Sequence, residues 1–306
     1  MKFLSRKTDS RHHALAPLLA SMLIFGTIGL FRRWFPVPSG FLAMIRGLVG
    51  AGTLMLWLRI RHFRLDCQVI RNNAVKLIIS GAAIGFNWIL LFEAYRYTTV
   101  AIATLCYYMM PVFVLVFSLL FFREPFSTRA VVCAGIALLG MIPVSGVLEG
   151  TAAGNMRGIL FGIAAAVLYS SVVLINKKIQ GIRDIDRTVP QLAAAAIVLV
   201  PYVLTAEAEE LRVIPWNAVS VLLLLIVGVI HTGFAYTLYF SSISLLPART
   251  VALFGYVDPV AAIFLSWLFL HEQMTLWQAA GSVLIIIALL LSEMQPSDRK
   301  TGQKPV

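Results

Sequence analysis

Two stretches that end long apolar runs decide the fold: PVFVLVFSLLFFRE at residues 111–124 and PVAAIFLSWLFLHE at residues 259–272. They lie 148 residues apart, and residues 85–124 laid on 233–272 without a gap share 12 identities in 40 positions. Chance matching in so apolar a composition gives roughly a tenth. The sequence therefore indicates an internal duplication.

The composition of this 306-residue chain is that of an integral membrane protein. Hydrophobic residues make up 59% of it and charged residues 13%, and the mean hydropathy is +0.87. Such a chain has too few charges for a water-soluble surface of this size. Runs of about 20 apolar residues, long enough to cross a roughly 30 Å hydrocarbon layer, occur ten times. These runs lie at about 14–31, 37–58, 76–95, 101–122, 130–148, 158–176, 190–206, 217–240, 250–270 and 275–292.

The expected fold is all-α and integral to the membrane, with ten transmembrane helices. A duplicated chain then has five helices in each copy, and an odd number turns the second copy upside down relative to the first. Two inverted five-helix repeats are the construction of many secondary transporters. The repeats are expected at 14–148 and 158–292, with cytoplasmic tails at 1–13 and 293–306.

The net charge of +11 reports orientation and does not indicate a nucleic-acid partner. With the N-terminus inside, the loops and tails on the inner side hold 19 Lys and Arg residues and the outer loops hold 5, which leaves Arg46 within a span. This asymmetry is the positive-inside rule. We therefore expect a multi-pass protein of the cell membrane with both termini in the cytoplasm.

Several function classes lack their sequence signatures. There is no GxxxxGK[ST] phosphate loop, and no HExxH, GxSxG or clustered acid pair that would form a catalytic centre. The three cysteines have no metal-ligand spacing. A channel is disfavoured because no charged ring repeats at matching positions of the two halves. The sequence thus predicts a protein that is not an enzyme and has no cofactor or metal. Its expected partners are the lipid bilayer and a small-molecule substrate, and its oligomeric state, monomer or homodimer, stays open.

Several segments resemble the drug/metabolite transporter superfamily, and specifically its ten-span group with two tandem EamA domains. The segments that carry the resemblance are FLAMIRGLVGA at 41–51, NWILLFEAYRYTTVAIATLCYYMMPVF at 87–113, FFREPF at 121–126, LYSSVVLINKKI at 168–179 and LFLHEQM at 268–274. In this family a glycine typically stands nine residues after the glutamate that ends the fourth and ninth spans. Gly281 obeys this pattern, whereas Cys133 stands at the matching position of the first copy. The resemblance implies a helical bundle around a central cavity that exports small metabolites, often amino acids, or drugs.

Asp258 is the strongest candidate for a functional residue. A carboxylate seven residues into an apolar run costs several kcal/mol unless it is paired, hydrated or protonated. Its counterpart in the first copy is Met110, so the architecture does not require an acid there. We expect Asp258 to couple transport to protons or to bind a substrate amine, with a structural ion pair or a hydrated helix end as alternatives. His231, in the middle of the eighth span, is the second candidate for proton coupling, against the alternative of a buried histidine bonded to a backbone carbonyl.

Arg46 and a group of aromatic and amide residues are the candidates for substrate binding. Arg46 lies ten residues into the second span and is able to hold a carboxylate through two hydrogen bonds, or to serve as a structural partner of Glu93. The other candidates are Asn87, Trp88, Tyr107, Tyr108 and Tyr256. Aromatic walls with a few amides suit a small amphipathic solute, although helix packing uses the same residue types.

Pro111 and Pro259 are predicted helix breaks at matching depths of the two copies, where each removes a backbone donor. A tolerated kink is the alternative. Glu124 and Glu272 are expected to cap the helix that follows each of them.

Together these features predict a secondary active transporter that exports a small, amino acid-like metabolite or a drug by alternating access, coupled to protons. An uncoupled facilitator or an importer with the same fold is the alternative. A membrane-embedded enzyme and a channel are remote alternatives.

Overall fold

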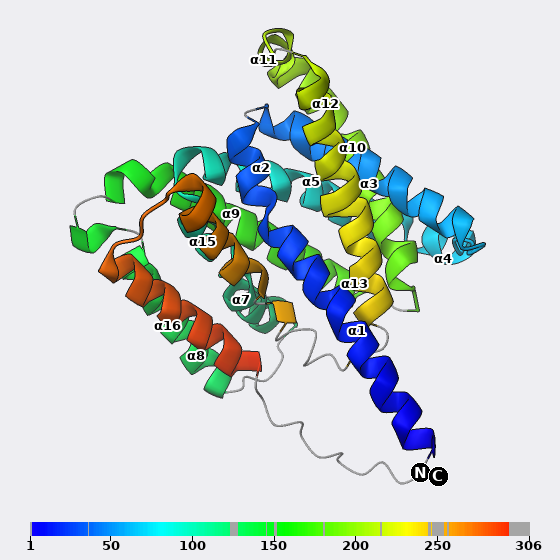
Figure 1. Cartoon of the computed structure of the whole chain (residues 1–306), viewed down its shortest axis with the longest axis horizontal. Helices are drawn as coiled ribbons and strands as arrows, with labels where there is room; N and C mark the ends of the chain where they lie inside the picture. Colours follow the sequence, from blue (N-terminus) through cyan, green and yellow to red (C-terminus); the bar gives the residue numbers. More distant parts are fainter. Residues whose placement is uncertain are drawn as a thin grey trace.

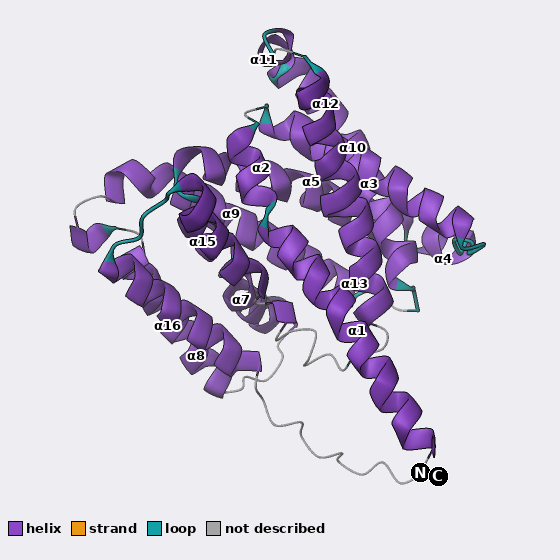
Figure 2. Cartoon of the chain, in the orientation of Figure 1, coloured by secondary structure: helices purple, strands orange, loops and turns teal. Residues whose placement is uncertain are grey.

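The computed structural model describes residues 2–35, 37–122, 128–144, 146–149, 152–179, 181–214, 216–243, 246, 254–255 and 257–293. Within these ranges the chain is helical and contains no strand (Figure 2). The long helices are α1 (Lys2–Gly26), α3 (Ser39–Ile60), α5 (Ala74–Tyr97), α8 (Thr128–Val144), α9 (Ala152–Lys177), α10 (Asp184–Ala206) and α16 (Leu276–Glu293). The shorter ones are α2 (Ile28–Trp34), α4 (Cys67–Asn72), α6 (Val100–Tyr107), α7 (Met110–Phe122), η1 (Val147–Glu149), α11 (Ala208–Arg212), α12 (Ala218–Leu225), η2 (Ile226–Phe234), α13 (Ala235–Ile243) and α15 (Val257–Leu270).

Six helical segments are long and apolar enough to cross a membrane within the described ranges. They are Ala14–Trp34, Ser39–Ile60, Ala74–Tyr97, Met156–Lys177, Asp184–Ala206 and Ala218–Ser242. Four shorter apolar segments are Val100–Val114, Val131–Val144, Val257–Leu270 and Leu276–Ala288. All ten coincide with predicted runs, but only six have full spanning length, so the count of ten spans stays a prediction.

The helices form a bundle with a separate pair at one side (Figure 1). α5 packs along α9 and α10, and α3 packs along α10 and η2. α8 and α16 form the pair at the side, whereas α1 runs beside α13 and α15. α1 begins at Lys2, so the residues expected as an N-terminal tail continue the helix beyond the bundle (Figure 1). The predicted tail after residue 293 lies outside the described residues.

Large apolar side chains cover the outward faces of these helices. Leu48 and Leu56 of α3, Ile78 of α5, and Ile197 and Leu204 of α10 are all more than half exposed. In water such a surface would drive aggregation, whereas a bilayer solvates it. The exposed leucines and isoleucines therefore fit a lipid-facing exterior.

Glycines allow the close approach of neighbouring helices. A Cβ atom built on Gly281 of α16 would lie 2.5 Å from the Gly140 carbonyl oxygen of α8, and one built on Gly81 of α5 would lie 2.5 Å from the Gln191 carbonyl oxygen of α10. Gly162 of α9 faces Cys106 of α6 in the same way. These contacts are the small-residue packing typical of membrane helices.

The predicted continuous span at 101–122 consists of two helices. α6 ends at Tyr107, and α7 begins at Met110, so the chain turns at Tyr108 and Met109, immediately before Pro111. Pro111 is the second residue of α7, and Pro259 is the third residue of α15. Both prolines therefore lie in the first turn of a helix, where the missing N–H would have no partner in the helix.

At one end of the bundle, two carboxylates cap helices that are distant from them in sequence. Glu207 accepts hydrogen bonds at 2.7 Å from the backbone N–H groups of Gly40 and Phe41, at the start of α3. Glu272 accepts from the N–H of Val100, at the start of α6, at 2.9 and 3.1 Å. Arg33 lies 3.4 Å from the same carboxylate. We name this the capped end of the bundle.

The prediction that Glu272 caps the helix after it is wrong, because the helix that it caps is α6, in the first copy. Sequence proximity suggested α16, whereas the fold brings the end of α15 to the start of α6. Burial raises the pKa of the Glu272 carboxyl above its ordinary value, against the opposing effects of Arg33 and of the backbone N–H groups. Glu124 lies outside the described residues.

Candidate functional site

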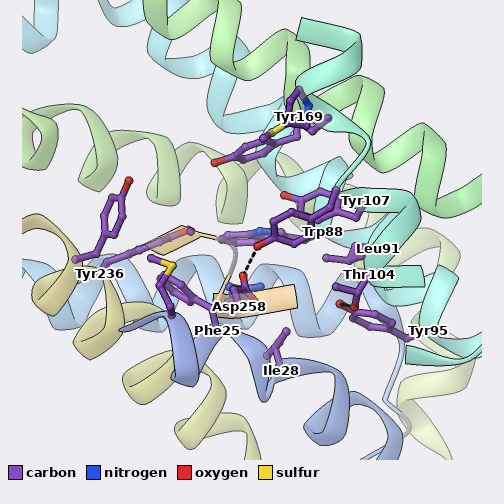
Figure 3. Close-up of a pocket in the computed structure, with 17 residues that line it drawn as sticks. Phe25, Ile28, Trp88, Leu91, Tyr95, Thr104, Tyr107, Tyr169, Tyr236 and Asp258 are labelled. Atoms are coloured by element: carbon purple, nitrogen blue, oxygen red, sulfur yellow. Dashed lines mark hydrogen bonds between the residues drawn. The ribbon is translucent and has the colours of Figure 1, made fainter. Parts of the chain in front are cut away.

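A cavity of about 400 Å³ lies between the helices (Figure 3). Residues from five of the predicted apolar runs line the cavity. These runs contribute through α3, α5, the consecutive helices α6 and α7, α13, and α15. α1 and α9 contribute as well, through Phe25 and Tyr169. The lining is predominantly apolar and aromatic, with one cationic and one anionic side chain, as is common in small-molecule sites.

Arg46 is the cationic side chain of the cavity. It is 6% exposed, and its Nε atom donates a hydrogen bond of 3.0 Å to Oγ1 of Thr232. Its guanidinium carbon lies 4.4 Å from the centre of the Trp88 ring, which is a cation–π contact. The alternative partner, Glu93, bonds instead to Arg96 at 3.0 Å and to Ser39 at 2.5 Å. Arg46 is thus held by Thr232 and Trp88 and reaches the cavity.

Asp258 is the anionic side chain and lies at the start of α15. Its Oδ2 atom accepts a hydrogen bond of 2.7 Å from the Tyr108 hydroxyl, drawn as a dashed line in Figure 3. Although Arg46 and Asp258 line the same cavity, they form no ion pair with each other. Met110, the counterpart of Asp258 in the first copy, lines the cavity too. The matching positions of the two copies therefore give the cavity one thioether and one carboxylate.

Tyrosine is the dominant residue of the cavity wall. Trp88, Tyr107 and Tyr108 line it as predicted candidates, and so do Pro111 and four tyrosines that were not predicted from the sequence. Those four are Tyr95, Tyr169, Tyr236 and Tyr239. The available signal was a phenol group within an apolar run, because a buried hydroxyl needs a hydrogen-bonding partner. Tyr169 also falls in the segment LYSSVVLINKKI, and Tyr236 lies one helical turn after Thr232.

His231 lies beside the cavity but is not among the residues that line it. Its Nε2 atom is 2.7 Å from the Thr27 hydroxyl, at the joint between α1 and α2, and its Nδ1 atom is 3.3 Å from the Ile226 carbonyl oxygen. The side chain is 1% exposed and packs edge-on against Phe31. The structure therefore brings His231 to the joint of two helices and not into contact with Asp258.

Two other candidates do not meet at the cavity. Asn87 is fully buried, and its Nδ2 atom donates a 2.6 Å hydrogen bond to the Ala165 carbonyl oxygen of α9, so its observed contact is between helices. Pro259 is buried near the start of α15 and is absent from the lining. Tyr256 lies outside the described residues.

The arrangement offers a solute three kinds of contact in one place. A guanidinium binds a carboxylate, a carboxylate binds an ammonium group, and the aromatic wall excludes water from an apolar portion. Because Arg46 and Asp258 are not paired with each other, both are able to contact a solute at once.

The comparisons with known proteins agree with this architecture. The model of the EamA-like transporter family matches residues 14–146 and 156–294. An uncharacterized transporter of Bacillus subtilis (strain 168), YxxF, is 28% identical over 94% of this chain and 92% of its own length. Protein PecM of Dickeya dadantii (strain 3937) is 25% identical over 76% of this chain and 78% of its own. One solved crystal structure, with a TM-score of 0.64 and 20% identity, covers 92% of this chain and 96% of the other and shares its fold.

The family model matches both halves of the chain, and its relatives include proteins named as transporters. With its apolar helices, the chain is a multi-pass membrane protein. It belongs to the EamA-like transporter family of the drug/metabolite transporter superfamily.

Proposed function

We propose that the chain is a secondary active transporter that exports a small, amino acid-like metabolite or a drug across the cytoplasmic membrane by alternating access, coupled to protons. The observation that carries the proposal is that Arg46 and Asp258 line the wall of one cavity without forming an ion pair with each other. Its volume of about 400 Å³ suits a small solute.

The proposed topology has ten spans in two inverted repeats. The six full-length segments are joined by the four shorter apolar segments, which cross the membrane as the remaining helices. The excess of Lys and Arg on one side puts both termini in the cytoplasm. The capped end, with Glu207 and Glu272, then faces outward.

A zwitterionic solute with an apolar side chain fits the chemistry of the cavity best. A carboxylate in the membrane interior is costly unless a cation meets it, and Arg46 supplies that cation. An ammonium group requires an anion for the same reason, and Asp258 supplies it. The tyrosines and Trp88 accommodate the apolar portion.

Proton coupling is assigned to Asp258. A carboxyl group that faces the outside in one conformation and the cytoplasm in the other is able to bind a proton on one side and release it on the other. Tyr108 donates to Asp258 from the turn between α6 and α7, so a movement of that turn changes the surroundings of the acid. His231 is a second proton-binding group in this proposal, at the joint of α1 and α2.

The first test compares extracellular metabolites of cells that express the wild type, Asp258→Asn, or no transporter. Glu209→Gln is a matched control, because this acid is exposed and pairs with Arg212 at the surface. We expect a compound enriched outside with the wild type and the control, but not with Asp258→Asn. Equal enrichment with Asp258→Asn removes that residue from the mechanism. A compound depleted from the medium by the wild type indicates an importer.

The second test separates coupling from binding in proteoliposomes. Asn keeps an acceptor for the Tyr108 hydroxyl but does not titrate. We therefore expect Asp258→Asn to lose flux driven by a pH gradient by about tenfold or more. Counterflow of the same compound within about threefold of the wild type would assign Asp258 to coupling alone, whereas a matching loss of counterflow would show that it also binds the ammonium group of the solute. If pH-driven flux is unchanged, the protein is a facilitator or uses another acid.

A further inference from the structure

A π-helix interrupts the span that faces Arg46. η2 covers nine residues between α12 and α13. In a π-helix the backbone hydrogen bonds join residues that are five apart in the sequence. Two of its side chains bond to the carbonyl group five residues earlier: Thr232 Oγ1 to Val227 at 3.2 Å, and His231 Nδ1 to Ile226 at 3.3 Å. π-helical segments are rare and are found frequently at functional sites. The proposed transport function does not account for this one.

Glycines on both sides bring η2 into close contact with α3. A Cβ atom on Gly50 would overlap the Thr232 side chain, and a Cβ atom on Gly228 would lie 2.5 Å from Val49. One on Gly233 would overlap the side chain of Thr53. The methyl side of Thr232 therefore packs over Gly50. Because a β-branched side chain has few rotamers, this packing fixes the direction of the Thr232 hydroxyl.

That hydroxyl meets Arg46, which lies one turn before Gly50 on the same face of α3. Thr232 accepts from the Arg46 Nε atom at 3.0 Å while its own proton goes to Val227. Trp88 covers one face of the guanidinium at 4.4 Å. No described residue forms a hydrogen bond or an ion pair with the two terminal nitrogens of Arg46. The edge of the guanidinium that binds a carboxylate with two hydrogen bonds is left for a solute.

We propose that Thr232, presented by the π-helix, is a positioning residue that holds Arg46 in the orientation that recognises a carboxylate group of the substrate. This inference rests on the proposed transport function for its biological meaning. The role of the hydrogen bond between Arg46 and Thr232 can be tested before the transported compound is known.

The variants are Thr232→Val, Thr232→Ser and the matched control Thr53→Val. Valine keeps the β-branched shape over Gly50 but removes the acceptor, whereas serine keeps the acceptor and loses the methyl group. Thr53 lies at the same interface, but its hydroxyl bonds to the Val49 carbonyl oxygen of its own helix at 2.8 Å. Thr53→Val thus removes a hydroxyl at the interface of α3 and η2 without touching Arg46.

The measurement is the Nε–H NMR signal of Arg46 in protein labelled with ¹⁵N-arginine in lipid nanodiscs, assigned by its loss in Arg46→Lys. We expect slow hydrogen exchange of this proton in the wild type, Thr232→Ser and Thr53→Val, and exchange faster by about tenfold or more in Thr232→Val. Benzoate, an aromatic carboxylate, is then titrated, with benzamide as its uncharged counterpart. Benzoate should shift the signal and bind about tenfold more weakly to Thr232→Val, and within about twofold of the wild type to Thr232→Ser.

Three outcomes would overturn the inference. The first is an Arg46 signal that is unchanged in Thr232→Val. The second is an equal loss of benzoate binding in Thr53→Val, which would make the effect one of general packing. The third is a benzamide effect equal to that of benzoate, or no benzoate effect, in the wild type. Any of these, together with intact flux of the exported compound, would leave the transport function standing.

Discussion

Glu272 shows how one side chain joins the two halves of the chain. It follows α15 in the second half and caps α6 in the first half through the N–H of Val100. A cap needs an acceptor but not a charge, so Glu272→Ala should cost about 1 kcal/mol of stability and Glu272→Gln less than half of that. The midpoint of thermal unfolding in detergent shows which of the two variants loses more stability, with Glu209→Gln as an exposed control. Equal losses for Ala and Gln would contradict the capping role.

Glu272 also makes the stability of the protein depend on pH in a direction that can be predicted. The pKa of Glu272 is raised by burial, so the folded protein binds this proton at a higher pH than the unfolded chain does. Its contribution to stability is present at low pH and is lost as the pH rises through the raised pKa. The wild type should therefore gain stability relative to Glu272→Gln as the pH falls from neutral, which thermal unfolding at a series of pH values measures. If the thermal stabilities of the wild type and Glu272→Gln changed with pH by the same amount, the raised pKa of Glu272 would be contradicted.

The sequence identified the charged residues of the cavity better than its walls. Arg46 and Asp258 stood out because ionised groups in apolar runs require a reason, and both line the cavity. Asn87, chosen as a polar amide for the pocket, and His231, chosen as a proton carrier, also lie in apolar runs, yet they bond to Ala165 and Thr27. Hydropathy indicates the depth of a residue in the bilayer, whereas the face of the helix that it occupies depends on packing that appears only in three dimensions.

At the scale of elements, the pair α8 and α16 depends on two facing glycines. A Cβ atom on Gly281 would lie 2.5 Å from the backbone oxygen of Gly140, which no side-chain rotation relieves. Gly281→Ala should therefore lower stability by about 1 to 3 kcal/mol. Gly135→Ala is the control on α8, because open space surrounds that glycine, and it should be neutral or slightly stabilising. Thermal unfolding of both variants tests the packing, and equal midpoints for the two would contradict it.

The sequence predicted where the membrane-spanning segments lie, but it predicted only some of the places where the helix within a segment is interrupted. Mean hydropathy located every apolar segment, and proline marked the turn before Pro111. The π-helix η2 carries no proline, and it accompanies glycines that face α3. Its wide turns are tied to contacts between helices distant in sequence, which local patterns do not record.

At the scale of the whole molecule, apolar side chains face outward on helices of spanning length, while Arg46 and Asp258 line a cavity inside. This distribution is the reverse of that in a water-soluble protein and suits a solute path through a bilayer. In the proposed mechanism, two similar halves of opposite orientation would rock around the cavity.

Counterflow of the transported compound by a variant with a filled cavity tests most directly whether the solute passes between these helices. Met110→Trp puts a larger side chain into the cavity, and Leu48→Trp adds the same ring to an exposed position of α3. With both variants folded and inserted, flux should fall by about tenfold or more in Met110→Trp and stay near the wild-type value in Leu48→Trp. Wild-type flux in Met110→Trp would show that the solute does not pass through this cavity.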